Sequence, residues 1–154
     1  MIPVQRLNHA VLYVRDAARA ATFYQDVFGF EIVTEMQGRA AFLRAAGSDN
    51  HHDLGLFSVG ADAPGPVQGA VGLYHLAWEV SSVRDLTTAR KALREHGAYV
   101  GESDHGATKS IYGRDPDGNE FEIMWLVPRD EWGAYERDAV VDPLDLDAAI
   151  ARWG

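Results

Sequence analysis

Two histidines occupy the same position in two similar segments of the chain. His9 lies in LNHAVLYV (residues 7–14), and His75 lies 66 residues later in LYHLAWEV (residues 73–80). A third candidate ligand, Glu122, stands in an apolar segment of the second half. Two neutral imidazoles and one carboxylate on one face of a divalent metal leave adjacent coordination positions open, as non-haem iron(II) oxygenases require. The sequence therefore predicts a metal site formed by His9, His75 and Glu122.

The segments that follow the two histidines indicate an internal duplication. Each histidine is followed by a helical pattern, a glycine and a strand-like segment, and the two glycines, Gly29 and Gly97, are 68 residues apart. Apolar residues at three-to-four spacing predict helices over residues 17–28 and 83–96. Because this offset nearly equals that of the histidines, we expect two tandem βαβββ modules.

The predicted fold class is α+β, in which the two modules form an open, cup-shaped mixed β-sheet and a short helix lies near the C terminus. We expect one domain over residues 1–127 and a tail over residues 128–154. Within the domain, module one covers about 5–59, a connector rich in glycine and proline covers 60–72, and module two covers 73–127. A chain of 154 residues can bury a proper core, so a metal is not needed for folding.

Two local signals position the elements of the second half. DPDGN (residues 115–119) has a proline and a glycine at turn positions and predicts a hairpin between residues 110–112 and 120–125. Strand alternation places Glu122 on the face opposite the bulky apolar residues of its segment. Near the C terminus, Asp145 is placed to cap the short helix.

Composition restricts the partners. The formal charge is −9 and the pI is about 5.0, which disfavours nucleic acid and anionic membranes, since phosphate binding requires concentrated Lys and Arg. Without cysteine, the six histidines and the carboxylates are the available metal ligands. We find neither a long apolar segment nor a basic-then-apolar start, and therefore expect a cytoplasmic protein with a small-molecule partner.

The paired histidines, the doubled module and the DPDGN turn before the strand of Glu122 resemble the vicinal oxygen chelate superfamily. This superfamily includes glyoxalase I, bleomycin resistance proteins, fosfomycin resistance enzymes and the type I extradiol ring-cleaving dioxygenases. The resemblance covers about residues 5–127. HHDLGL (residues 51–56) resembles the histidine-containing strand of extradiol dioxygenases, and DHGATKSIY (residues 104–112) resembles their later stretch with a histidine and a tyrosine. The tail segments PRDEW (residues 128–132) and PLDLD (residues 143–147) resemble small catechol-2,3-dioxygenase-like proteins.

The resemblance implies a metal-dependent extradiol dioxygenase that acts on a catechol-type molecule and dioxygen, as a homodimer. It implies iron(II) as the metal, with manganese(II), zinc(II) and nickel(II) as alternatives. It further implies three catalytic residues. His52 would act as acid and base, His105 would orient the substrate or direct proton transfer, and Tyr112 would donate a hydrogen bond to a metal-bound oxygen. His51 remains the alternative to His52, because strand alternation does not decide which row faces the pocket.

Other interpretations stay open. The metal could serve as a Lewis acid in a glyoxalase-type isomerase or lyase, with Asp53 in place of that enzyme's additional glutamate. Paired modules could instead sequester a drug, as bleomycin resistance proteins do. His51 and His52 could also be solvated loop residues, His105 a turn residue and Tyr112 a core residue. The larger ring-cleaving enzymes carry four modules, whereas this chain has two.

Overall fold

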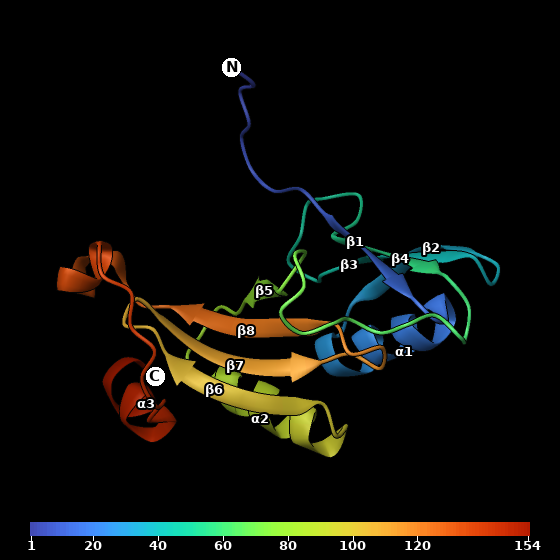
Figure 1. Ribbon diagram of the computed structural model, residues 1–154. Helices are drawn as coiled ribbons and strands as arrows, with labels where there is room; N and C mark the ends of the chain where they lie inside the picture. The colour runs from blue at the N-terminus through green and yellow to red at the C-terminus, as the bar shows by residue number, and fades with distance from the viewer. The chain divides into compact units, whose positions relative to one another are not determined.

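The computed structural model describes residues 1–154 and divides them into two compact units, Met1–Pro66 and Val67–Gly154. Each unit contains one βαβββ module, as the duplicated sequence predicts, and each is described here by itself (Figure 1). The elements of unit 1 are β1 (Ala10–Val14), α1 (Ala17–Phe28), β2 (Glu31–Met36), β3 (Ala40–Arg44) and β4 (Leu54–Ser58).

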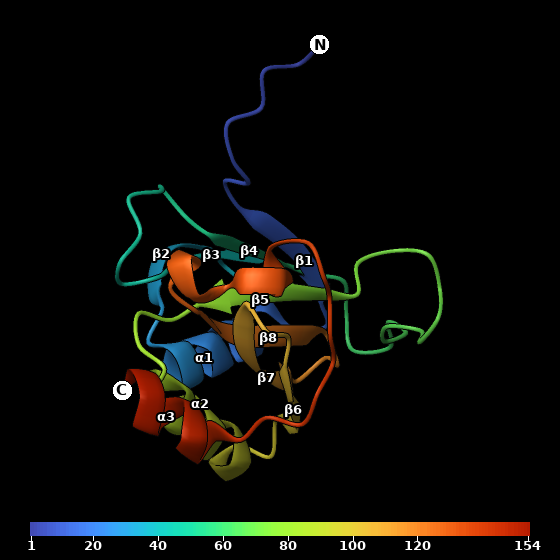
Figure 2. The same cartoon turned by 90° about the vertical axis from the view of Figure 1, so that its left-hand side faces the viewer.

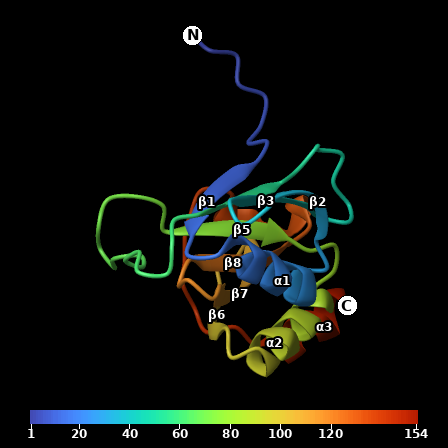
Figure 3. The same cartoon turned by 90° about the vertical axis from the view of Figure 1, so that its right-hand side faces the viewer.

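The sheet of unit 1 has the strand order β1-β4-β3-β2. β1 pairs with β4 in parallel, while β3 pairs with β4 and β2 in antiparallel fashion, so the sheet is mixed. α1 lies against one face (Figure 3) and buries the apolar side chains that point toward it. The core between sheet and helix comprises Leu12, Val14, Ala20, Ala21, Tyr24, Leu43, Leu54 and Leu56.

Local caps determine where α1 begins and ends. The carboxylate of Asp16 accepts hydrogen bonds from the backbone N–H groups of Ala18 and Arg19, which satisfies two donors of the first turn. At the other end Gly29 adopts a φ of 66°, a left-handed conformation that favours glycine. The helix over residues 17–28 is therefore confirmed with its predicted bounds.

Unit 2 repeats this topology with the strand order β5-β8-β7-β6, and β5 pairs with β8 in parallel. α2 covers one face of this sheet. The helix is shorter at both ends than the predicted 83–96. Residues 83–84 form a turn before it, and the N–H of the preceding Ser82 bonds to the carboxylate of Asp85. At the other end His96, with a φ of −92° and a ψ of 3°, leaves the helical conformation. The elements are β5 (His75–Glu79), α2 (Asp85–Glu95), β6 (Tyr99–Asp104), β7 (Thr108–Arg114), β8 (Glu120–Leu126), η1 (Arg129–Glu131), η2 (Gly133–Glu136) and α3 (Leu146–Trp153).

The DPDGN segment forms the predicted turn between β7 and β8. One carboxylate oxygen of Asp115 accepts hydrogen bonds from the N–H groups of Asp117 and Asn119, each at 2.9 Å, and Gly118 has a φ of 90°. The resulting antiparallel register pairs Tyr112 with Glu122. The turn therefore decides which residues of the two strands stand side by side.

The C-terminal helix α3 packs on unit 2. Asp145 caps it by accepting a hydrogen bond from Ala148 N–H at 2.9 Å, as predicted. The ring of Trp153 lies 5.5 Å from that of Trp125 in β8, and the C-terminal end of α3 lies near the start of α2 (Figure 2). The fold class is thus confirmed: α+β, with two open mixed sheets and a short C-terminal helix. No helix has the length and apolar character to span a bilayer.

Candidate metal site and the residues around it

Unit 2 brings two of the three predicted ligands together. His75 opens β5 and Glu122 lies in the neighbouring strand β8, so the parallel pairing of these strands places both side chains on one face. His75 Nε2 lies 3.1 Å from Glu122 Oε2. Glu122 is only 9% exposed, and this imidazole is its sole ion-pairing partner. A buried carboxylate with so little compensation is costly, which makes the pair a candidate for a bound cation.

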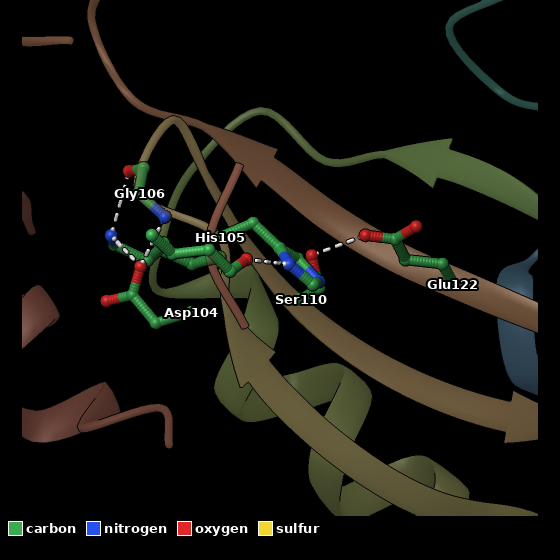
Figure 4. Close-up of polar contacts among 7 residues, drawn as sticks. Asp104, His105, Gly106, Ser110 and Glu122 are labelled. Atoms are coloured by element: carbon green, nitrogen blue, oxygen red, sulfur yellow. Dashed lines mark hydrogen bonds and ion pairs between the residues drawn. The ribbon is translucent and has the colours of Figure 1, made fainter. Parts of the chain in front are cut away.

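Ser110 holds the second oxygen of Glu122. Its hydroxyl, fully buried in β7, donates a short hydrogen bond to Glu122 Oε1 (Figure 4). Since Oε1 is held in this way, Oε2 is the oxygen directed at His75. Sequence reasoning did not single out Ser110, and the only available signal was its place in the strand two residues before Tyr112.

The geometry of this pair fits a divalent metal. Two ligand atoms bound at ~2.1 Å and at right angles to each other lie ~3.0 Å apart, close to the observed separation of the two atoms. His75 Nδ1 is buried and has no hydrogen-bond partner, so Nε2 is the nitrogen that this site engages. His75 and Glu122 can therefore supply two adjacent positions of a coordination sphere.

Tyr112 and His105 adjoin the His75–Glu122 pair. The ring of Tyr112 lies 5.7 Å from that of His75, and its hydroxyl lies 2.6 Å from His105 Nε2. His105 Nδ1 faces the carbonyl of Val140 at 2.8 Å and must donate to it, so Nε2 of the neutral imidazole accepts a hydrogen bond from the Tyr112 hydroxyl. Burial, with the nearby charge of Glu122, raises the pKa of Tyr112 to about 12. Tyr112 is therefore a phenol whose hydrogen is donated to His105.

Unit 1 presents His9 and His52 on the sheet face that α1 leaves open. Their ring centroids are 4.5 Å apart, and His52 also lies 5.1 Å from the ring of Phe42. Burial lowers the pKa of His52, and His9 and His51 lower it further against the opposing effect of Asp53. His51 is exposed, and it contacts His52 through their Nδ1 atoms, 3.0 Å apart, and through their rings, 5.3 Å apart. Of the two alternatives, His52 is thus the one beside a predicted ligand.

The segment around His52 differs from the strand that its sequence resembles. β4 begins at Leu54, and His51 and His52 lie in the loop before it. Uninterrupted alternation would place His52 in the row of Leu54 and Leu56, which face the core, whereas its ring contacts Phe42 on the open face. The alternation fails because the side chain of Asp53 holds residues 45–53 in a loop.

Asp53 organises that loop through three hydrogen bonds. Oδ2 accepts from Ala45 N–H, while Oδ1 accepts from the hydroxyl of Ser48 and the amide of Asn50, all at 2.7–2.8 Å. Burial alone would raise the pKa of the Asp53 carboxyl, but these hydrogen bonds outweigh it and lower the pKa below its usual value. Because both oxygens are engaged, Asp53 is poorly placed to bind a metal.

We expect Asp53→Asn to destabilise the protein near neutral pH by about 2 kcal/mol, since the amide loses charge-assisted hydrogen bonds from partly buried donors. The folded pKa is depressed, so this stabilisation is present above the unfolded pKa and is lost as the pH falls through the folded pKa. Urea unfolding followed by circular dichroism at pH 7 and pH 3 measures the difference. If the difference in the free energy of unfolding between wild type and variant were larger at pH 3 than at pH 7, the expectation would be wrong.

The three predicted ligands are therefore divided between the units. His75 and Glu122 meet within unit 2, and His9 belongs to unit 1. Neither unit by itself groups three side chains able to hold a metal ion. A cavity of about 220 Å³ in unit 2 is a separate feature, because Lys109, Glu131, Arg152 and their neighbours line it and none of the predicted site residues does.

Comparison with known proteins gives the family context of these residues. Residues 6–123 match the Glyoxalase/Bleomycin resistance protein/Dioxygenase superfamily. The chain is 30% identical over 127 residues to a catechol-2,3-dioxygenase of Bacillus subtilis, covering 82% of this chain and 43% of that protein. It is 30% identical over 131 residues to a manganese-dependent 2,3-dihydroxybiphenyl 1,2-dioxygenase of Geobacillus genomosp. 3, covering 82% of this chain and 38% of that protein. The chain thus spans less than half the length of these two relatives.

This chain also resembles a solved structure, and it matches a larger share of that structure's length than of the two dioxygenases. A lactoylglutathione lyase from Agrobacterium tumefaciens matches with a TM-score of 0.60 and 26% identity, covering 80% of this chain and 96% of that one. The same fold therefore occurs in proteins named for different reactions.

Proposed function

Because the chain belongs to the glyoxalase/bleomycin resistance protein/dioxygenase superfamily, we propose that it is a metal-dependent extradiol ring-cleaving dioxygenase acting on a catechol-type small molecule. The observation that carries this proposal is the His75–Glu122 pair, 3.1 Å apart, with the Tyr112–His105 pair beside it. The His75–Glu122 pair can bind a metal, and the Tyr112–His105 pair can donate or accept protons beside it. The named dioxygenase relatives favour this reaction over others of the superfamily.

His9, His75 and Glu122 would hold the metal, which we propose to be iron(II). Manganese(II) is the first alternative, since one relative is named for it, and zinc(II) and nickel(II) follow. When bound, such a metal offers adjacent open positions at which substrate and dioxygen can be held together and exchange electrons. Ser110 supports this role by holding Glu122 Oε1 and leaving Oε2 directed at His75.

His52 is the proposed acid and base. Its depressed pKa keeps the imidazole neutral near neutral pH, so a ring nitrogen can accept a phenolic proton from the substrate. Its position against His9 and Phe42 holds the ring on the open face of the sheet. The same nitrogen can return the proton in a later step.

Tyr112 and His105 would act as a unit. In the resting arrangement Tyr112 donates to His105 Nε2 and so has no hydrogen left for the substrate. When His105 takes up a proton, Nε2 becomes a donor, and the phenol is free to turn its hydrogen toward a substrate oxygen. Because the pKa of Tyr112 is about 12, the phenol keeps its proton throughout the pH range of ordinary assays.

A glyoxalase-type isomerase or lyase is the second candidate. The likeness to a lactoylglutathione lyase over 96% of its chain favours it. The three hydrogen bonds to Asp53 weigh against it, because they occupy both oxygens of the carboxylate that would serve as the additional ligand. A drug-binding protein of the bleomycin resistance type would not require the His75–Glu122 pair to bind a metal.

An anaerobic assay tests the dioxygenase proposal. Protein purified without chelators is loaded with iron(II) under nitrogen, mixed with a panel of catechols and then exposed to oxygen. We expect a yellow ring-fission product and stoichiometric oxygen uptake, both abolished in His9→Ala. Confirmed iron content without product from any catechol would reject the proposal, and a preference for zinc or nickel would favour the lyase. Size-exclusion chromatography of the same sample tests the proposed homodimer.

A further inference from the structure

We propose that Asn8, Asn50 and Asp53 form a hydrogen-bonded relay that places the proton of His9 on Nδ1 and leaves Nε2 as its metal-binding nitrogen. The first part concerns the chain alone, and the second part rests on the proposed function. These residues are positioning residues, since they act on the metal only through His9. The relay joins two segments of unit 1 that are 42 residues apart in sequence.

The relay begins at Asp53, whose ionised carboxylate can only accept hydrogen bonds. Asn50 Nδ2 donates to Asp53 Oδ1 at 2.7 Å and to the backbone carbonyl of Asn8 at 2.8 Å. Both partners are acceptors, so the amide nitrogen of Asn50, and not its oxygen, must face them. The orientation of the Asn50 amide is thereby determined.

The oxygen of Asn50 consequently points toward two donors. Oδ1 accepts from Arg6 Nη2 at 2.7 Å and from Asn8 Nδ2 at 2.9 Å. Arginine has no acceptor, which independently supports the same orientation. Asn50 thus uses both of its donors and both lone pairs, and a flipped amide would lose all four hydrogen bonds.

The amide of Asn8 transmits this orientation to His9. Because Asn8 Nδ2 is directed at Asn50, Asn8 Oδ1 is the atom that lies 2.8 Å from His9 Nδ1. An amide oxygen can only accept, so His9 Nδ1 must carry the hydrogen, and neutral His9 has its lone pair on Nε2. Metal-binding histidines commonly donate their other N–H to such an acceptor, which fixes the ring and its tautomer.

His75, at the equivalent position of the second module, is held differently. Tyr74 precedes it in place of an asparagine, and His75 Nδ1 has no hydrogen-bond partner. Its orientation comes instead from Glu122 at Nε2. The two histidines of the duplicated segments therefore present the same nitrogen by different means, and only His9 depends on a side-chain relay.

The tautomer is measurable in the metal-free protein. Nitrogen-15 NMR of the histidine rings at about pH 8.5, where imidazole is neutral, should show His9 protonated at Nδ1. His96 and His105 are internal references, because their Nδ1 atoms face backbone carbonyls at 2.9 and 2.8 Å. A wild-type His9 protonated mainly at Nε2 would overturn the proposal without any variant being needed.

Three variants test the individual links. Asn8→Ala removes the acceptor and should move His9 toward the Nε2-protonated form, whereas Asn8→Asp keeps an acceptor and should retain the wild-type tautomer. Asn50→Ala leaves Asn8 without its orienting partner and should give a mixture of both forms. If His9 keeps the wild-type tautomer in Asn8→Ala, the Asn8–His9 contact does not set it. If His9 keeps that tautomer in Asn50→Ala, the link from Asn50 to Asn8 is not needed. The ring signals of His75 should stay unchanged in every variant.

Metal titration separates this inference from the proposed function. Isothermal titration with manganese(II) should show at least about tenfold weaker binding by Asn8→Ala and near wild-type binding by Asn8→Asp. If the tautomer shifts as expected but the wild-type protein binds no metal, the relay stands and the proposed metal site fails. If metal binds and the tautomer does not respond to Asn8→Ala, the relay fails and the proposed function is unaffected.

Discussion

Glu122→Gln is expected to weaken metal binding by at least about 100-fold, because it removes the only anionic ligand of the proposed site. Glutamine has nearly the same shape and can still accept the hydrogen bond from Ser110, so β8 should keep its place in the sheet. The variant therefore tests the charge at this position and not the packing around it. Titration with manganese(II) or iron(II) under nitrogen, monitored by calorimetry, gives the two dissociation constants.

Glu120→Gln is the matched control for this substitution. Glu120 lies two residues earlier in the same strand, and its carboxylate pairs with Arg114 at 3.0 Å. The charge change is identical, but no predicted metal ligand is altered. Equal losses of metal affinity in the two variants would indicate a general electrostatic effect. Unchanged affinity in Glu122→Gln would show that Glu122 is not a metal ligand.

Phe121→Ala should lower the free energy of unfolding of unit 2 by about 3–5 kcal/mol. Phe121 is 1% exposed, and the close fit of its ring explains the glycine opposite it: a Cβ on Gly113 would lie 2.6 Å from the ring. Truncation removes this packing and leaves a cavity on the face of β8 opposite the side chain of Glu122. We therefore expect the metal site to lose its rigidity together with the stability of the sheet.

Tryptophan fluorescence during urea unfolding measures this effect in the correct unit, since all four tryptophans lie in unit 2. Leu126→Ala is the control: Leu126 ends the same strand, is 39% exposed and should lose less than about 1 kcal/mol on truncation. Similar losses in the two variants would mean that Phe121 does not carry the packing described above.

Local signals were sufficient for much of the fold. The bounds of α1 follow from Asp16 and Gly29, which lie next to the helix and cap it directly. The hairpin of β7 and β8 follows from the DPDGN segment for the same reason. Each of these features depends on hydrogen bonds between residues a few positions apart, so the sequence predicts them without knowledge of the remaining chain.

The loop before β4 shows where such reasoning fails. Uninterrupted strand alternation would put His52 in the row of Leu54 and Leu56, but the carboxylate of Asp53 accepts hydrogen bonds from Ala45, Ser48 and Asn50 and holds this segment in a loop. β4 accordingly begins only at Leu54, after the residues that these hydrogen bonds hold. Periodicity describes only the pleat of a strand and cannot show where side-chain hydrogen bonds end it.

By itself, the sequence determined the doubled module, the helices and turn that delimit it, and the residue types able to bind a metal. Only the tertiary structure decided that Glu122 stands beside His75, that Ser110 holds its other oxygen, and that Asn50 orients Asn8 next to His9. The reason is physical. Capping and alternation act between neighbours in the chain, whereas hydrogen bonds at the site join residues brought together by strand order and register.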